Sequence, residues 1–180
     1  MSLEFQLKVF WIPWFDSLIK KTTSSTCSIT WLAITKSNSL SLISNNQASG
    51  SNGNGGGIGG MGLFLNATIQ NSTIVGNAAW ESGSGIYIKD VSSSTTNVQI
   101  INTILRNEQL LCSYCPSGNS YEEISSKEDG STQQDDANFT VSYSLVRGGW
   151  SGTGILDTDP LFCNPDISDF NLYNNSPCVG

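Results

Sequence analysis

The stretch Thr68-Ile-Gln-Asn-Ser-Thr-Ile-Val-Gly-Asn77 decides the fold, because versions of it recur along the chain. The other copies are Val98-Gln-Ile-Ile-Asn-Thr-Ile-Leu-Arg-Asn107, Phe139-Thr-Val-Ser-Tyr-Ser-Leu-Val-Arg-Gly148 and the weaker Ser39-Leu-Ser-Leu-Ile-Ser-Asn-Asn46. Their last residues lie about 31, 30 and 41 positions apart, a period that is typical of repeat architectures in which each unit stacks on its neighbours. The sequence therefore predicts a repeat protein.

Each repeat supplies short strands that cannot bury a face alone. A second repeated element, Gly55-Gly-Gly-Ile58 and Gly83-Ser-Gly-Ile-Tyr-Ile88, is a glycine turn that leads into a strand. Stacking the repeats about 4.8 Å apart pairs equivalent strands and gathers the inward Ile, Leu and Val into columns. We expect an all-β fold, a right-handed parallel β-helix of roughly five coils, with the hand taken from the crossover rule. Aligned amides can hydrogen-bond along a stack, so Asn46, Asn77 and Asn107 are predicted to form an asparagine ladder.

The length of 180 residues fits one domain. We place the β-helix at residues 27–180 and treat residues 1–26 as an N-terminal cap or a non-domain segment, with a peripheral membrane anchor as the alternative. The insert 112–137 is acidic and poor in apolar residues, so it is predicted to project as a mobile loop. We expect the chain to be a monomeric part of a longer protein.

Composition excludes several function classes. The net charge is −7, with 8 Lys and Arg against 15 Asp and Glu, which disfavours a nucleic-acid partner because binding to phosphates needs a cationic face. The chain has no histidine, which excludes Ser-His-Asp catalysis and imidazole metal sites. No apolar run is long enough for a transmembrane segment. Neither a metal site nor a cofactor is predicted.

Several motifs resemble a known family. Gly55-Gly-Gly-Ile58 followed by Asn71-Ser-Thr-Ile-Val-Gly-Asn77 is similar to the coils of bacterial right-handed β-helix surface proteins of the pectin-lyase-like superfamily. Asp157-Thr-Asp-Pro-Leu-Phe162 with Asn175-Ser-Pro-Cys178 resembles their C-terminal closing segment, although Ile155-Leu156 stands where the family usually has Asn-Ile. The resemblance implies a secreted or cell-surface domain, often associated with the outer membrane, that acts in adhesion or contacts polysaccharide or cell-surface glycans.

The enzymes of that superfamily are pectate lyases, pectin lyases and polygalacturonases. Their Gly-His-Gly signature is impossible without histidine, and no Arg-x-Lys occurs. The expectation is therefore a non-enzymatic domain. The alternative is a polysaccharide lyase or glycoside hydrolase that uses Asp157, Asp159 and Arg147, although Asp159-Pro160 is more simply explained as a turn before Leu161-Phe162. A second alternative is an inert spacer in a larger surface protein.

Two tryptophans are candidates for carbohydrate contact. Trp150 follows Gly148-Gly149 in a turn where its ring could stack on a sugar, and Trp80 follows an Asn-Ala-Ala turn. For both, the alternative is packing against the end of the fold.

The chain has five cysteines, an odd number. Given the extracellular location that the resemblance implies, Cys163 and Cys178 are expected to form a disulfide that closes a loop of about 15 residues, worth about 3 kcal/mol. Cys112 and Cys115 are candidates for a second, local disulfide. Cys27 remains, and we expect it to be buried.

Overall fold

The structure is a computed structural model that describes residues 18–20, 23–24, 41–49, 53–62, 66–90, 96–107, 122–126 and 137–179. Within these residues the chain is essentially all-β, as predicted. In the described part of the chain the strands are short, two to five residues each, and the single helical element is the 3-10 turn η1 (Pro165–Ile167). None of the described residues forms a helix of the length and hydrophobicity needed to cross a membrane.

Four of the sheets are parallel and are built from strands that recur along the chain. The five-stranded sheet has the order β1 (Leu18–Lys20), β3 (Ser41–Ser44), β7 (Ser72–Val75), β11 (Ile104–Arg106) and β14 (Leu145–Val146). One three-stranded sheet contains β2 (Thr23–Ser24), β4 (Gln47–Ala48) and β8 (Ala78–Ala79). Another contains β5 (Ile58–Gly62), β9 (Ile86–Asp90) and β12 (Ile124–Ser125). The last contains β6 (Asn66–Gln70), β10 (Asn97–Ile101) and β13 (Asn138–Ser142).

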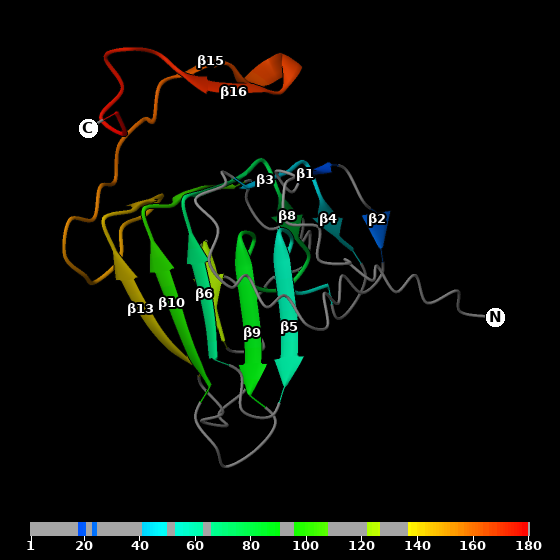
Figure 1. Cartoon of the computed structure of the whole chain (residues 1–180). Coiled ribbons are helices and arrows are strands. Elements are labelled where there is room, and N and C mark those ends of the chain that lie inside the picture. Colours follow the sequence, from blue (N-terminus) through cyan, green and yellow to red (C-terminus); the bar gives the residue numbers. More distant parts are fainter. Residues whose placement is uncertain are drawn as a thin grey trace.

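These strands lie side by side in Figure 1. The arrows of β6, β10 and β13 run in one direction, and those of β5 and β9 run in the other. The fifth sheet is an antiparallel pair, β15 (Phe162–Asn164) and β16 (Asp169–Leu172), which lies at the C-terminal end of the chain.

The core consists of columns of apolar side chains that run across the parallel strands. Because equivalent residues pair in register, an inward side chain stacks on its counterpart in the next strand. The column through the five-stranded sheet, for example, joins Ile43, Ile74, Leu105 and Val146. Two further columns join Ile69, Ile100 and Val141, and Ile58, Ile86 and Ile124.

The strands of the copies at 68–77 and 98–107 are offset by one residue from the predicted alignment, whereas the other copies pair with the predicted spacing. The sequence alignment places Thr68 opposite Val98, whereas in the structure Ala67 pairs with Val98. The cause is Gly76, which adds a residue in the left-handed region (φ 65°) between β7 and Asn77. Arg106 pairs with Val75, and Asn107 follows it directly, so the third copy lacks this extra residue.

Short strands occur in two segments that the predicted boundaries leave outside the stacked strands. Residues 18–20 and 23–24, assigned above to the N-terminal cap or non-domain segment, are strands that pair with β3 and β4. Residues 122–126 fall in the insert predicted to project, yet β12 pairs with β9 and Ile124 belongs to the core. The acidic composition of the insert hid a short apolar strand.

The closing segment is held by polar contacts. The buried Ser176 hydroxyl donates to the Pro160 carbonyl at 2.6 Å, and Asn45 Nδ2 donates to Ser168 Oγ at 3.0 Å. The predicted bridge between Cys163 and Cys178 is not formed, since both are free thiols. The Ser176 hydrogen bond closes the loop in its place. Burial raises the pKa of the Cys178 thiol, which the Ser176 hydrogen bond partly offsets. Cys27, Cys112 and Cys115 lie outside the described residues.

Candidate functional site

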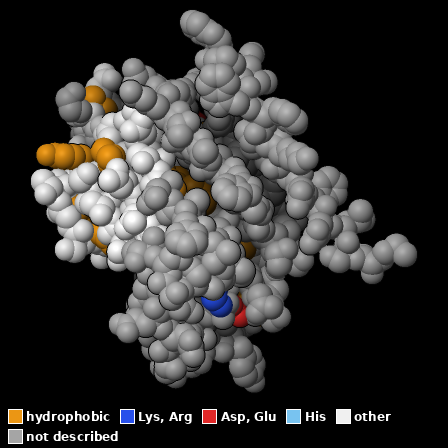
Figure 2. Space-filling model, turned by 60° about the horizontal axis from the view of Figure 1, so that its bottom comes forward, with side chains coloured by type: hydrophobic (Ala, Val, Ile, Leu, Met, Phe, Trp, Pro, Cys, Tyr) orange, Lys and Arg blue, Asp and Glu red, His pale blue; other side chains and the backbone are white. Residues whose placement is uncertain are grey.

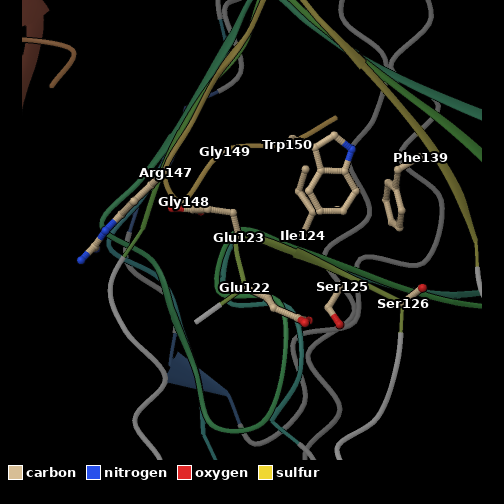
Figure 3. Close-up of a pocket in the computed structure, with 10 residues that line it drawn as sticks. All are labelled: Glu122, Glu123, Ile124, Ser125, Ser126, Phe139, Arg147, Gly148, Gly149 and Trp150. Carbon is tan, nitrogen blue, oxygen red and sulfur yellow. The ribbon is translucent and has the colours of Figure 1, made fainter. Parts of the chain in front are cut away.

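A pocket of about 250 Å³ lies where the last described repeat ends. Its lining comes from β12 and its flanks, from the start of β13 and from the turn after β14. Figure 3 shows Trp150, Phe139 and Ile124 grouped together on one side, with Ser125 and the Glu122 carboxylate below them. The full lining is Glu122, Glu123, Ile124, Ser125, Ser126, Phe139, Arg147, Gly148, Gly149 and Trp150.

Trp150 is held at the pocket by a turn that only glycine adopts easily. Gly148 and Gly149 both have positive φ (83° and 79°), a conformation that is strained for residues with a Cβ. The Gly149 amide donates to the Val146 carbonyl and the Gly148 amide donates to Asp157 Oδ1. The turn leaves the Trp150 side chain 37% exposed.

Phe139 supports the indole. Its ring lies edge-on to Trp150, with centroids 6.2 Å apart and planes at 82°, an arrangement favoured between aromatic rings. Phe139 pairs with Val98, which pairs with Ala67, so the last strand carries a ring where the earlier copies carry small side chains. Phe139 is not among the residues predicted from sequence, although its size stands out once the paired strands are aligned.

Behind the pocket runs a line of buried hydrogen bonds through the predicted asparagines. Asn77 Oδ1 accepts from the backbone amide (2.9 Å) and the side-chain amide (3.0 Å) of Asn46. Asn107 Oδ1 accepts the same two groups of Asn77, at 3.1 and 2.7 Å. All three asparagines are buried.

Glu123 ends this line. Its Oε1 accepts the Asn107 backbone amide at 2.8 Å and its Oε2 accepts Asn107 Nδ2 at 2.6 Å. The next strand offers no asparagine, because the residue in that position is Gly148. Glu123, which is only 3% exposed, thus accepts the two hydrogen bonds that a fourth asparagine of the ladder would accept, although it comes from another part of the repeat. We call each such acceptor a rung of the ladder.

The position of Glu123 in the repeat is that of a glycine. Ile58, Ile86 and Ile124 pair with one another, so the preceding residues Gly57, Gly85 and Glu123 are equivalent. A Cβ on Gly85 would lie 2.7 Å from Asn107 Nδ2 and 2.8 Å from the Glu123 carbonyl oxygen. The earlier repeats therefore need glycine to leave room for the asparagines. This alignment was the signal that sequence reasoning missed.

The candidate catalytic residues make backbone contacts. Asp157 Oδ1 accepts the Gly148 amide and Asp159 Oδ1 accepts the Leu161 amide, both at 3.0 Å. Arg147 Nη1 donates to the Asn107 carbonyl at 2.7 Å. In Figure 3 the Arg147 guanidinium points away from Trp150. Asp157 and Asp159 thus stabilise turns, and Arg147 binds backbone.

Trp80, the other tryptophan candidate, lies away from the pocket. Its backbone amide donates to the Gly53 carbonyl, and a Cβ on Gly53 would lie 2.9 Å from the Trp80 Cβ. The residue is partly exposed and packs tightly against the segment at Gly53.

Beside the pocket, the sheet of β6, β10 and β13 carries rows of uncharged polar residues. Asn66, Asn97 and Asn138 form one row, and Thr68, Gln99 and Thr140 form the next. In β10 and β13 these positions are exposed. In the view of Figure 2 the described surface is mostly white, with some hydrophobic side chains and few charged ones.

A corner follows this sheet. Asn71, Asn102 and Tyr143 occupy its equivalent left-handed positions (φ 51°, 49° and 48°), and Asn102 Nδ2 donates to Asn71 Oδ1 at 2.7 Å. Tyr143 is 65% exposed and is not among the lining residues of the pocket.

Among the described residues, no group of three or more His, Cys, Asp or Glu side chains is placed to hold a metal ion. Comparisons with protein-family models, with curated proteins and with solved structures found no match to this chain.

Proposed function

We propose that this chain is a non-enzymatic, secreted or cell-surface domain that contacts polysaccharide or cell-surface glycans. The observation that carries the proposal is the pocket, in which an exposed indole and a supporting phenyl ring lie above serine hydroxyls. Sugars offer a C–H face that packs on aromatic rings and a rim of hydroxyls that needs hydrogen-bonding partners. The amphipathic pocket matches both requirements.

The proposed architecture is a right-handed parallel β-helix. It is supported by parallel strands that pair in register with strands one repeat earlier, a spacing of 31 residues between Asn46 and Asn77. Aliphatic columns and buried amide hydrogen bonds along the stack support it further. A rigid stack of this kind presents polar rows at regular intervals, which suits contact with an extended polymer.

The role of the aspartates supports a domain without chemistry. A hydrolase or lyase would need Asp157 or Asp159 directed at substrate, whereas both carboxylates accept hydrogen bonds from backbone amides in turns.

Affinity electrophoresis on a panel of neutral and acidic polysaccharides tests the proposal. We expect retention of the wild type, loss of retention in Trp150→Ala, and no effect of Tyr143→Asn. Tyr143→Asn is the matched control because it removes an exposed ring outside the pocket and installs the residue that Asn71 and Asn102 provide at equivalent corners.

Mass analysis of the same polysaccharides after incubation, with and without calcium, separates the alternatives. Shortened or unsaturated products that disappear in Asp157→Ala or Asp159→Ala would establish an enzyme. Absence of both retention and products would favour the inert spacer.

A further inference from the structure

The pocket is small. Ligand pockets for drug-sized molecules span roughly 300–1,000 Å³. A volume of about 250 Å³ is below that range, so it suits one sugar ring rather than several.

The charges around the pocket are mostly negative. Glu122 and Glu123 both contribute to the lining, and Asp157 binds the Gly148 amide at its edge. Glu122 is exposed, whereas the two oxygens of Glu123 face Asn107. A carboxylate on the ligand would therefore meet the exposed Glu122 carboxylate, whereas the Glu123 carboxylate is turned toward Asn107. The net charge of −7 acts in the same direction over longer range.

Among the described residues that line the pocket, the one cation is Arg147, and its side chain is directed elsewhere. Arg147 Nη1 donates to the Asn107 carbonyl at 2.7 Å, and in Figure 3 its guanidinium lies on the side away from Trp150 and Phe139. A uronate placed on the indole would gain no ion pair in this arrangement. The polar part of the lining on this side includes the uncharged Ser125, which is buried, and Ser126.

We infer that the pocket takes a single uncharged sugar ring, stacked on Trp150, and discriminates against the corresponding uronate through Glu122. This inference rests on the proposed function, because it names the class of glycan that the same site accepts. The proposed function does not specify whether the glycan is neutral or acidic, and this inference specifies a neutral one.

The test uses sugar pairs that differ only in the carboxylate: the methyl glycosides of glucose and glucuronate, galactose and galacturonate, and mannose and mannuronate. Saturation-transfer NMR on the full chain gives the affinity for each. In at least one pair we expect the neutral sugar to bind and the uronate to bind at least about fivefold more weakly, the size expected for one like-charge contact near a protein surface.

Two variants assign the effect. Trp150→Ala should abolish binding of the neutral sugar. Glu122→Gln should lower the ratio of the two affinities, neutral sugar over uronate, toward one, since it removes the charge and keeps the shape of the side chain.

The failures are distinguishable. If a uronate binds as tightly as its neutral partner or more tightly, and does so through Trp150, the glycan function stands and this inference falls. If discrimination persists unchanged in Glu122→Gln, the assigned cause is wrong. If no sugar binds, or binding survives Trp150→Ala, both the inference and the assignment of the site are overturned.

Discussion

Asn77 and Glu123 play the same part in the line of buried hydrogen bonds, since each accepts the backbone and side-chain amide hydrogens of an asparagine. They come from different parts of the repeat. Asn77 follows β7 and accepts two amide hydrogens with one oxygen, whereas Glu123 precedes β12 and accepts them with two. In the earlier repeat, Gly85 precedes its strand and Asn107 is the hydrogen-bonding residue. In the last repeat the two residue types are exchanged: Glu123 stands in the position of Gly85, and Gly148 stands in the position of Asn107. The line of buried hydrogen bonds thus continues to Glu123 while the last sequence repeat changes composition.

That exchange has a consequence for the surface. With Gly148 in the asparagine position, the chain turns through Gly148 and Gly149 and brings Trp150 over Phe139. In the regular repeats the large aliphatic side chains are buried in columns. In the last repeat the large side chain of Trp150 is partly exposed at the pocket. Substitutions in the regular region should therefore reduce stability, and those at the pocket should reduce binding.

The largest effect is expected in the regular region. Ile74→Ala removes a fully buried side chain at the centre of the five-stranded sheet and should lower the free energy of unfolding by about 2–5 kcal/mol. Urea denaturation measures the loss. Ile167→Ala, 75% exposed in η1, is the control and should change stability by less than about 0.5 kcal/mol. Equal effects of the two variants would contradict the assigned core.

The next largest effect on stability is expected at Glu123, and its neighbour Glu122 provides the comparison. Glu123→Gln presents an amide where Asn107 needs an acceptor and should cost about 1.5–3 kcal/mol, because a hydrogen bond to a charged group is lost in a buried site. Glu122→Gln, at an exposed position, should have almost no effect on stability. Thermal unfolding followed by circular dichroism separates them, and a stable Glu123→Gln would show that Glu123 is not a rung.

A third substitution tests the need for glycine beside the rung. Gly85→Ala would bring its Cβ to 2.7 Å from Asn107 Nδ2 and should cost about 1–3 kcal/mol. Gly60→Ala is the matched control, because its Cβ meets only the end of the Ile88 side chain, which can move. Chemical denaturation of both variants gives the comparison. If Gly85→Ala were as stable as Gly60→Ala, Asn107 would be able to move away from the added Cβ, and the need for glycine at this position would be contradicted.

The smallest effect is expected in the closing segment. Ser176→Ala removes the donor to the Pro160 carbonyl and the acceptor of the Cys178 amide, at a cost of about 1 kcal/mol. Hydrogen exchange should rise at the Cys178 amide while the amides of β7 stay protected. Uniformly faster exchange would instead mean that the segment unfolds together with the stack.

The sequence predicts the parts of this fold that depend on periodic patterns. The all-β class follows from alternating Ile, Leu and Val in segments too short to be independent, and the structure confirms it. Composition misleads where a segment is mixed: the acids of the insert conceal Ile124, which completes a column with Ile58 and Ile86.

The site was harder to predict because its residues come from three separate segments. Trp150 is recognisable from its glycine turn, but its partner Phe139 lies in a strand and Ser125 in the insert. The one-residue offset at Gly76 also blurs the alignment that would identify Phe139 and Glu123 as departures from the repeat. Only the pairing register brings these positions together.

The most direct test of the account follows the indole N–H signals of the five tryptophans by ¹⁵N NMR while a bound glycan from the retention panel is added. The signal that is missing in Trp150→Ala should shift in proportion to saturation, and the signal missing in Trp80→Phe should not move. A shift at Trp80 with none at Trp150, or no shift at either while the glycan is bound, would contradict the assignment of glycan contact to this pocket.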